Sequence, residues 1–566
     1  MPTLHFKGKS VIETHHHTVP HHTLAFDKKL SVLDEGQEPS LDGNLIIEGD
    51  NLLALKALLP THAGKVKCVY IDPPYNTGNE GWVYNDNLTQ PQFKEWIGQT
   101  VGKEGEDYSR HDKWCCMMYP RLMLLKELMR EDGCIWVSIG DDEQRHLRHL
   151  LDEVFGPQNF IGTVVWQNAT GPKQSNTLSY SHEYVLCFAK DATKWSRNLL
   201  PRNEVQEADY TNRDDDPRGP WRDSGLDARN YYSQGKYSIT CPGGRVIEGP
   251  PEGRYWSISE DTLWDLDDDN RIWWGDDQNN VPRLKRFLSE AKAGVIPQTV
   301  WTYDEVGHSQ EAKKDYLRVL SGEEVFTTPK PVRLIDRIIA VSSDSDGLIL
   351  DAFAGSGTTG QAVLEKNLAD GGNRTFILVQ MPHDTKKHKD ESINIAQRLA
   401  FKRIKNVMTG YQYKRRAGKG KWKKETAEGI GGSFTYAKLS DEPLFGDYRD
   451  LGDKLPAYDD IAAYIFYTET SHEWLGSDRR KNKAFDKKTG RIGEHRGTSY
   501  YLLYRPNDER DWGLDLDFAY DKLKDDPNRQ LVVYCEKISL HRDQLRKFAD
   551  DTGRRVRPML VPFNLK

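Results

Sequence analysis

Long apolar runs are missing from this chain of 566 residues. No stretch of eighteen or more apolar residues occurs, so we expect no segment that spans a bilayer. The first residues, MPTLHFKGKSVIETHHHTVPHH, also lack the apolar core of a secretory signal, and we expect the protein to stay in the cytoplasm. Because 37% of the residues are hydrophobic and 29% are charged, the composition indicates a globular rather than a disordered chain.

Paired cysteine spacings are missing as well. None of the seven cysteines forms a Cys-x-x-Cys pair, which favours reduced, buried thiols over a disulfide framework or a zinc site. Histidines cluster near the start of the chain, but no carboxylate or cysteine stands at a defined spacing from them. We therefore expect no metal, and we interpret this cluster, which consists of His15, His16, His17, His21 and His22, as a surface segment.

An excess of positive charge is also absent. The formal net charge is −7, whereas small DNA-binding modules are usually basic. In a large enzyme the sum can hide local patches, and basic clusters do occur at Lys402-Arg403-Lys405, at Lys414-Arg415-Arg416 and among the lysines from Lys419 to Lys424. These lysines can track phosphates or simply keep the segment solvated, so the charge balance alone decides nothing.

Short apolar runs alternate with helical patterns in two parts of the chain. Strands are predicted at Lys67–Ile71, Gly133–Ile139, Glu183–Phe188, Leu348–Leu350 and Thr375–Val379, with helices at Tyr119–Met129 and from about Ile393 to Val407. This alternation is typical of an α/β sheet that is covered by helices. Between the two parts, Gly, Pro, Asp, Arg and Trp dominate, which predicts a loop-rich insertion with short strands.

These changes of character predict six regions. A segment rich in Lys and Gly near residue 420 indicates a linker, and further strands at Ser499–Tyr504 and Gln530–Tyr534 indicate a smaller α/β domain without a chemical motif. We expect an N-terminal extension (1–40), two halves of one α/β domain (41–190 and 301–413), the insertion (191–300), a basic linker (414–433) and a C-terminal domain (434–566).

A glycine-rich turn follows the predicted strand that ends at Leu350. Gly355, Gly357 and Gly360 satisfy G-x-G-x-x-G, which lets a backbone approach a ligand beside a helix N-terminus. The pattern is compatible with a dinucleotide, with S-adenosylmethionine, or with a plain strand-to-helix turn. A dinucleotide site would place an acidic residue at the end of the next strand, where this chain has Gln380.

The tetrapeptide Asp72-Pro73-Pro74-Tyr75 directly follows another predicted buried strand, the position where α/β sheets bind ligands. Two consecutive prolines restrict φ and remove two backbone donors. The Asp72 carboxylate and the nearby carbonyls can then accept hydrogen bonds from an amine. The alternative is a Pro-Pro turn in which Asp72 acts as a cap.

Together, the tetrapeptide and the segment Asp351-x-Phe353-x-Gly355 resemble the motifs of β-class DNA amino-methyltransferases, most of all the modification subunits of type III restriction systems. Four further segments carry the likeness, namely Glu48–Leu52, Gly133–Glu143, Arg254–Trp301 and Thr328–Pro331. The resemblance covers residues 40 to 410, approximately. It implies a Rossmann-like sheet for an S-adenosylmethionine-dependent methyltransferase, with 191–300 as an inserted target-recognition region and a smaller C-terminal α/β domain.

The resemblance also implies roles for individual residues. Asp72 and the Pro73 carbonyl would accept the two hydrogens of an exocyclic amine, and Tyr75 would stack on a base extruded from the duplex, with Pro74 completing the catalytic tetrapeptide. Asp50 would lie near the adenosine of the cofactor, although it can equally be a helix cap. The implied cofactor-binding residues are Asp50, Lys330, Asp351, Phe353, Ala354, Gly355, Ser356, Gly357, Thr358, Thr359 and Gln380.

By the same resemblance, the expected reaction is methyl transfer from S-adenosyl-L-methionine to the N6 amine of adenine in double-stranded DNA, in a restriction-modification system. The expected partners are duplex DNA, a second copy of the chain and a restriction (helicase-nuclease) subunit, and no membrane. The expected role of the tryptophans Trp256, Trp273 and Trp274 in the insertion is structural, as core residues.

Three alternatives stay open. Methylation of the cytosine N4 amine fits the motifs, although those relatives more often have Ser where Asp72 stands. A nicotinamide oxidoreductase would use the glycine loop but leaves Asp72 to Tyr75 unexplained, and the intact motifs argue against a catalytically silent DNA-binding subunit. Cytosine C5 methylation usually needs a Pro-Cys dipeptide, which this sequence does not contain.

Overall fold

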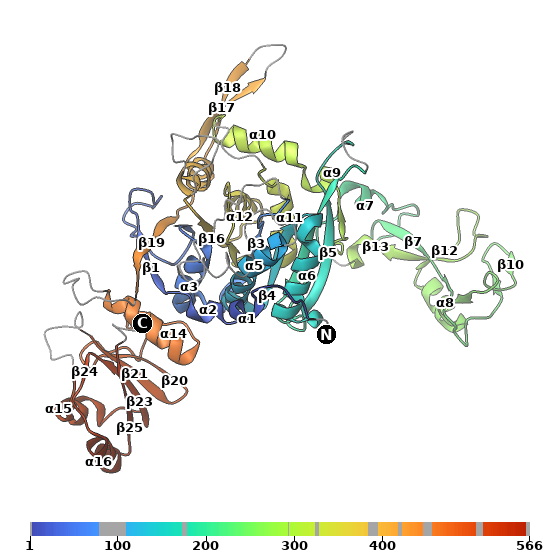
Figure 1. Ribbon diagram of the computed structural model, residues 1–566. Helices are drawn as coiled ribbons and strands as arrows, with labels where there is room; N and C mark the ends of the chain where they lie inside the picture. The colour runs from blue at the N-terminus through green and yellow to red at the C-terminus, as the bar shows by residue number, and fades with distance from the viewer. Residues whose placement is uncertain are drawn as a thin grey trace. The chain divides into compact units, whose positions relative to one another are not determined.

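The computed structural model describes residues 3–77, 109–172, 178–291, 294–322, 328–382, 394–416, 422–444, 456–504 and 513–561 (Figure 1). The chain divides into two compact units, one formed by residues 1–197 and 298–566 and the other by residues 198–297. No helix in these described ranges is both long and apolar enough to cross a membrane.

A mixed sheet forms the centre of the first unit. In spatial order, its strands within the described residues are β1 (His22–Phe26), β19 (Thr435–Pro443), β2 (Leu45–Glu48), β16 (Thr375–Gln380), β15 (Leu348–Asp351), β3 (Val66–Ile71), β4 (Met129–Ile139), β6 (His182–Ala189), β5 (Phe160–Gln167) and β14 (Val300–Trp301). Neighbours from β19 to β4 are parallel, whereas β6 runs antiparallel to both β4 and β5. Every residue of β3 is buried, as expected for a parallel strand with both faces covered.

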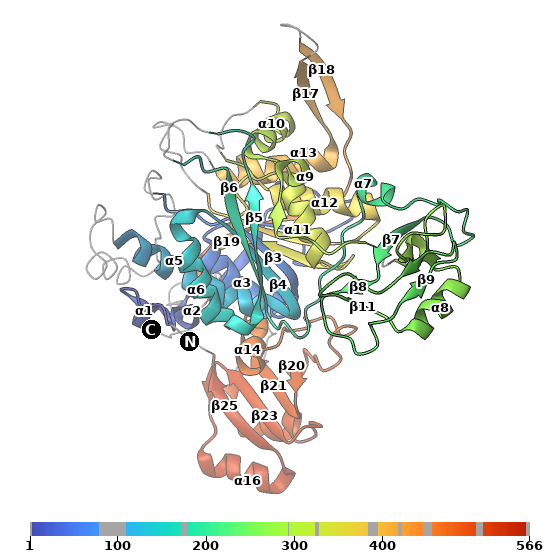
Figure 2. The same ribbon diagram turned by 90° about the vertical axis from the view of Figure 1, so that its right-hand side faces the viewer.

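Helices cover both faces of this sheet (Figure 2). On one face lie α1 (Lys9–Ile12), α2 (His15–Thr18), α3 (Asn51–His62), α5 (Ser109–Leu128) and α6 (Asp141–Phe155). The other four helices of this group all pack against α5. The other group comprises α9 (Tyr303–Val306), α10 (Ser309–Val319), α11 (Val332–Ser342), α12 (Thr358–Asp370), the π-helical turn η3 (Ala396–Phe401) and α13 (Lys402–Thr409). This arrangement confirms the predicted α/β fold.

β15 and β3 pair in parallel at the middle of the sheet, and the connections that leave these two strands run toward opposite sides of the sheet. From β15 the chain passes through α12 to β16 on one side, and from β3 it passes through α5 to β4 on the other side. Open α/β sheets bind ligands at the carboxyl edge of such a switch point. Asp351 ends β15 and Asp72 directly follows β3, so the fold brings the two sequence motifs to this edge.

Three expectations about the ends of the chain are wrong. The segment 414–433 is not a linker, because β17 (Tyr411–Arg416) and β18 (Trp422–Ala427) pair as an antiparallel hairpin; residues 417–421 lie outside the described residues. Strand β19 joins the central sheet, and β1 pairs with it, so neither a separate 1–40 extension nor a boundary at 434 describes the fold. The interpretation of the histidines as a surface segment is wrong for His15, His16 and His22, which are buried, whereas His17 is exposed.

The reasons for these errors are local. Lys and Gly suggested a solvated segment, but the alternation of Tyr411 and Tyr413 with polar residues gives the hairpin the two-residue period of a strand. His15 and His16 are buried where α2 packs against α5, and His22 is buried in β1, which pairs with β19. The basic helix predicted from Ile393 is confirmed over η3 and α13, although Ile393 itself lies outside the described residues. All seven cysteines are buried, and none forms a disulfide.

The C-terminal part of the first unit has its own sheet. Its strands are β20 (Arg491–His495), β21 (Thr498–Leu503), β23 (Gln530–Cys535) and β25 (Arg555–Leu560), which confirms the two strands predicted there. Around it lie α14 (Tyr458–Thr470), α15 (Leu516–Phe518), η6 (Ala519–Leu523) and α16 (Arg542–Thr552), with the short pair β22 (Gly513–Leu514) and β24 (Lys537–Ile538). Tyr467 of α14 donates a hydrogen bond to Glu127 of α5 at 2.9 Å, which ties this sheet to the central one.

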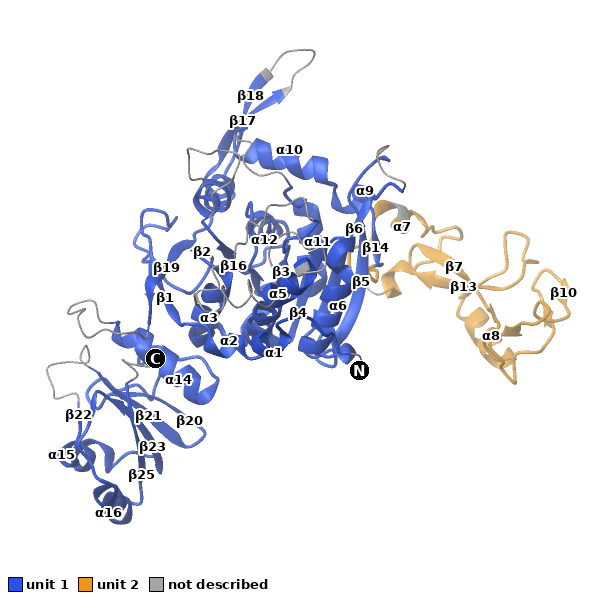
Figure 3. Cartoon of the chain, viewed as in Figure 1, with its two compact units in different colours: residues 1–197, 298–566 blue, residues 198–297 orange. Residues whose placement is uncertain are grey.

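The second unit is built from short strands (Figure 3). They are β7 (Trp221–Gly225), β8 (Asp227–Ala228), β9 (Ile239–Thr240), β10 (Val246–Ile247), β11 (Tyr255–Trp256), β12 (Ile272–Trp273) and β13 (Arg283–Phe287), together with α7 (Glu204–Ala208), α8 (Glu260–Asp268) and the turn η2 (Leu288–Glu290). Trp256 and Trp274 lie in its core, and Trp273 packs against Trp221 at 5.3 Å between ring centroids. The structural role expected for these tryptophans is therefore confirmed.

Candidate active site

An ion pair holds the carboxylate that follows β3. The Lys330 ammonium donates to both oxygens of Asp72, at 2.8 and 2.7 Å, although the two residues are 258 positions apart. Burial raises the pKa of Asp72, and the charge of Lys330 opposes this shift. Burial alone would lower the pKa of Lys330, but Asp72 and then Glu183 outweigh it, and the net shift is upward. Both groups are therefore stabilised in their charged forms by each other.

Tyr75 is fixed beside this ion pair. Its hydroxyl donates to Glu183 Oε2 at 2.8 Å, and the Asn168 amide donates to the other Glu183 oxygen at 2.8 Å. The Lys330 ammonium lies 4.9 Å from the centroid of the Tyr75 ring and 3.7 Å from Glu183. A Cβ on Gly140 would come within 3.1 Å of the Tyr75 ring, so the glycine leaves room for the ring. Burial raises the pKa of Tyr75 well above its usual value, which keeps the phenol protonated.

The two proline carbonyls have different surroundings. The Trp114 indole donates to the Pro74 carbonyl at 2.7 Å. Among the described residues, none donates a hydrogen bond to the Pro73 carbonyl. Pro73 therefore retains an acceptor next to the Asp72 carboxylate.

A buried glutamate holds the loop after Tyr75. Glu143, from the start of α6, accepts hydrogen bonds from the Asn76 amide at 2.5 Å, from His111 Nδ1 at 2.6 Å and from His146 Nδ1 at 2.7 Å. Asn76 has φ of 56°, a left-handed conformation that Asn tolerates better than most residues. The polar atoms of Glu143 and the two histidines lie within 4.8 Å of one another. The meeting of His111 with Glu143 and His146 was not predicted, because His111 is distant from both in the sequence, although Glu143 closes the GDDE segment that carries part of the resemblance.

The loop after β15 is closed by hydrogen bonds of its own. One oxygen of Asp351 accepts from the Phe353 backbone at 2.9 Å, and the other accepts from the Thr359 hydroxyl at 2.5 Å. Burial raises the pKa of Asp351 to about 7, because these neutral donors offset only part of the desolvation. Gly355 and Gly357 have φ of 52° and 79°, which only glycine adopts readily.

Arg403 fastens the same loop from α13. Its fully buried guanidinium donates to the hydroxyls of Ser356 at 3.0 Å and Thr358 at 2.8 Å, and to Gln361 at 2.7 Å. Burial lowers the pKa of Arg403 to about 10. A Cβ on Gly357 would lie 3.1 Å from the Cα of Ala400, so the helical segment packs directly on the loop. The hydroxyls therefore face the protein, and the loop presents backbone to its other side.

Gln380 and Asp50 flank the glycine loop. Gln380, at the end of β16, accepts from the Gly355 backbone with its side chain at 2.7 Å, so its carboxamide organises the loop. Asp50 caps α3 by accepting from the backbones of Leu52 and Leu53 at 2.8 and 3.3 Å. The structure thus shows Asp50 as a helix cap. Only one of its oxygens makes the cap, and the second oxygen, which lies 3.7 Å from Arg121, can accept a further hydrogen bond.

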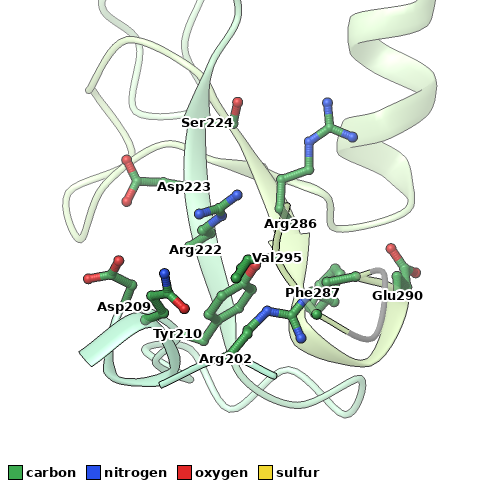
Figure 4. Close-up of a pocket in the computed structure, with 13 residues that line it drawn as sticks. Arg202, Asp209, Tyr210, Arg222, Asp223, Ser224, Arg286, Phe287, Glu290 and Val295 are labelled. Carbon is green, nitrogen blue, oxygen red and sulfur yellow. The ribbon is translucent and has the colours of Figure 1, made fainter. Parts of the chain in front are cut away.

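The second unit contains a cavity of its own, of 620 Å³ (Figure 4). Tyr210 lies between Arg202 and Arg222, whose guanidinium carbons are 5.9 and 5.3 Å from the centroid of its ring. Arg222 stands directly opposite Arg286 in the antiparallel pairing of β7 with β13. Like charges in such a pair repel, but Asp209, Asp223 and Glu290 also line the cavity, so it presents cationic and acidic side chains together.

Comparisons with known proteins agree with the motifs at the switch point. The chain is 35% identical over 371 residues to the Mod subunit of the type III restriction-modification enzyme StyLTI from Salmonella typhimurium, which covers 64% of this chain and 54% of that protein. It is 32% identical over 435 residues to the EcoP15I Mod subunit from Escherichia coli, with 69% and 66% covered. This chain thus spans between about half and two thirds of the length of the curated relatives it matches.

A solved structure, PvuII DNA methyltransferase (cytosine-N4-specific), aligns with 65% of this chain and 89% of its own at 14% identity, with a TM-score of 0.34. This score is low, and the α/β fold of the chain rests on the strand order of its central sheet. The family model described as DNA methylase, for N6 and N4 methyltransferases, matches residues 66–386, more than half of the chain and the part that holds both motifs. The chain therefore belongs to the N6/N4 DNA methylase family.

Proposed function

We propose that this protein transfers the methyl group of S-adenosyl-L-methionine to the N6 amine of adenine in duplex DNA. One observation carries the proposal: the Asp72 tetrapeptide and the Asp351 glycine loop end adjacent parallel strands at the switch point of the sheet. An acceptor for an amine and a loop for a cofactor then lie side by side. Neither a nicotinamide oxidoreductase nor a silent DNA-binding subunit would require that juxtaposition.

The amine acceptors are the Asp72 carboxylate and the Pro73 carbonyl. The exocyclic nitrogen of adenine is a weak nucleophile because its lone pair is delocalised into the ring. Two acceptors that each bind one amine hydrogen draw the nitrogen toward tetrahedral geometry, which localises the lone pair on the nitrogen and leaves it facing the methyl donor. Lys330 binds both Asp72 oxygens, so an incoming amine shares that carboxylate with Lys330 and does not find it unpaired.

The charges around Asp72 suit this reaction. Asp72 and Glu183 flank the single cation Lys330, which gives the three groups a formal charge of −1. As the N–C bond forms and the S–C bond breaks, positive charge develops on the nitrogen, and a fixed negative cluster stabilises it. The proton that the methylated nitrogen releases passes to Asp72 or to water. Tyr75, held by Glu183, offers a face for stacking on the extruded base.

The residues around the glycine loop fit the cofactor. S-adenosylmethionine supplies an electrophilic methyl group on a sulfonium. Because Ser356 and Thr358 point toward Arg403, the loop offers backbone, without polar side chains, to a ligand at the sheet edge. The second oxygen of Asp50 can accept from a hydroxyl or an amino group of that ligand. Gln380 orders the loop through Gly355, so its role toward the cofactor is positioning.

We assign target recognition to the unit 198–297. Three arginines and three acidic residues line its cavity, and such a mixture of donors and acceptors suits the hydrogen-bonding edges of bases. The relatives named Mod subunits belong to restriction-modification enzymes, and we propose that this chain likewise acts as a modification subunit with a restriction subunit as its partner. A homodimer is proposed by the same likeness.

The decisive experiment uses the full chain, unmethylated duplex DNA and S-adenosylmethionine labelled in the methyl group. After digestion to nucleosides, label in N6-methyl-2′-deoxyadenosine supports the proposal. Label in N4-methylcytosine would replace adenine by cytosine and keep the methylase, and an absence of transfer with hydride exchange from a nicotinamide would overturn the reaction class. Methylome sequencing of cells that express the chain then gives the target sequence.

A further inference from the structure

The hairpin of β17 and β18, which we call the basic ribbon, places like charges opposite one another. In its register Lys414 faces Lys424 and Arg415 faces Lys423, and all four side chains are exposed. Because successive residues of a strand point to opposite faces, each face of the ribbon carries one cationic pair. Such pairs destabilise a sheet, so nothing in the folding of the ribbon itself favours them.

The acidic groups of the ribbon do not neutralise these cations. Glu425 is the one acidic residue in the two strands, and it accepts from the Tyr413 hydroxyl at 2.9 Å. Its other oxygen lies 3.7 Å from Arg415, a distance that gives an exposed pair little strength. The ribbon therefore retains a concentrated positive charge on the surface.

The base of the ribbon is anchored. Arg318 of α10 donates to the Tyr411 hydroxyl at 3.3 Å and lies 5.0 Å from the centroid of the Tyr413 ring. Ser321 donates to the carbonyl of Gln412 at 3.0 Å. Both views show the strands projecting past α10, with this end attached (Figures 1 and 2). The charges are thus held out from the unit on a supported arm.

The arm starts close to the proposed active site. It follows α13 directly, and Arg403 at the start of α13 binds the hydroxyls of the glycine loop. Helix α13 has eight residues, a length of roughly 12 Å at 1.5 Å per residue. The ribbon therefore begins within about one short helix of the sheet edge where the base would be methylated.

We propose that the basic ribbon binds the phosphate backbone of duplex DNA beside the target base. This inference rests on the proposed function, which supplies the polyanion. A two-stranded ribbon fits the major groove in width, and lysines on both of its faces can reach the phosphates on either side. Because these contacts carry no base information, the ribbon would add affinity and salt dependence without altering the target sequence.

The test replaces Lys414, Arg415, Lys423 and Lys424 by Gln in the full chain. Each lost phosphate contact should reduce the slope of log K against log salt by about 0.9, so the four together reduce it by up to about 3.6. The KM for DNA rises at physiological salt, while kcat at saturating DNA and low salt stays within twofold of the unchanged protein. A matched control replaces Lys522, Lys524, Arg546 and Lys547, also three lysines and one arginine and all exposed, in the C-terminal part of the chain.

Stability separates binding from misfolding. Removing like-charged pairs relieves repulsion, so the quadruple variant should melt at or above the temperature of the unchanged protein. Three results would overturn the proposal: an unchanged salt slope, an equal loss in the control, or a ribbon that instead captures an acidic protein. Methyl transfer by the unchanged chain would still support the proposed function in each case. If the unchanged chain methylates no DNA, the proposed function fails, and the salt slope of duplex binding still decides the role of the ribbon.

Discussion

Asp72 and Asp351 stand at the ends of neighbouring parallel strands, yet their surroundings differ in kind. Asp72 is paired with a cation, Lys330, and its side chain is 24% exposed. Asp351 is 3% exposed and is bound by neutral donors, the Phe353 backbone and the Thr359 hydroxyl. The difference indicates that one carboxylate is kept charged and accessible for chemistry, whereas the other closes a loop.

The largest effect is expected at the first carboxylate. Asp72→Asn removes the charge that Lys330 neutralises and places an amide donor where the substrate amine needs an acceptor. We expect kcat for methyl transfer to fall on the order of 10²–10³-fold, the range for loss of one preorganised transition-state contact. Cofactor binding, measured by calorimetry, should survive. Activity within threefold of the unchanged protein would remove Asp72 from its proposed role.

The next largest effect is expected when the Lys330 side of the ion pair is removed. Lys330→Met removes the charge that opposes the upward pKa shift of Asp72, so the pKa of Asp72 rises further. Because the reaction needs the carboxylate, the pH below which kcat falls should move upward, and the activity lost on this acidic limb should recover as the pH is raised. The measurement is a pH profile of kcat whose acidic limb moves to higher pH. Lys330→Arg keeps the charge and serves as the control; a loss that is independent of pH would contradict this account.

The contrast between the carboxylates also shows what the sequence could reveal. Both loops were predicted because each directly follows an apolar run that reads as a buried strand, which is local information. The ion pair between Asp72 and Lys330 was not, because it joins residues 258 positions apart. Glu183 was missed for a related reason: it lies at the active edge only because β6 runs antiparallel, and the pattern of apolar residues does not give the direction of a strand.

In the glycine loop, a motif that the sequence did reveal also has a packing role that the sequence did not reveal. The G-x-G-x-x-G spacing indicated a ligand loop, but Gly357 and Gly360 also make room for Ala400 and Ile404 of the helical segment that packs on it. Arg403, which binds Ser356 and Thr358, was visible only as one member of a basic cluster. A buried arginine cannot be told from a solvated one by sequence alone, since its burial depends on what packs around the helix. The hairpin at 411–427 was missed because composition outweighed its two-residue period.

A smaller effect is expected at the aromatic ring. Tyr75→Phe keeps the face that would stack on the extruded base and removes the hydrogen bond to Glu183. Loss of one such bond is worth about 0.5–1.5 kcal/mol, so kcat/KM for DNA should fall about 2- to 12-fold. Tyr75→Ala, which also removes stacking, should lose clearly more, as measured by steady-state kinetics and by fluorescence of 2-aminopurine at the target base. Equal losses in both variants would mean that the ring does not stack.

The smallest effect on transfer is expected at the second carboxylate. Asp351→Asn keeps an acceptor for the Phe353 backbone, and the amide can bond the Thr359 oxygen, so kcat and the KM for the cofactor should stay within threefold. Its consequence lies in stability. The pKa of Asp351 is about 7 in the folded protein, above the usual value near 3.8. At a pH between these two values, the folded state therefore binds more protons than the unfolded state.

Stability should therefore fall as the pH rises from about 4 to about 7, by on the order of 1.4 kcal/mol for each pKa unit of the shift. Asn carries no charge, so Asp351→Asn removes this component. The melting temperature of the variant, relative to that of the unchanged protein, should rise steadily across this window and level off above it. A difference that does not depend on pH would show that Asp351 stays ionised in the folded protein. Asp72 and Asp351 would then carry the same charge and differ only in their exposure to solvent.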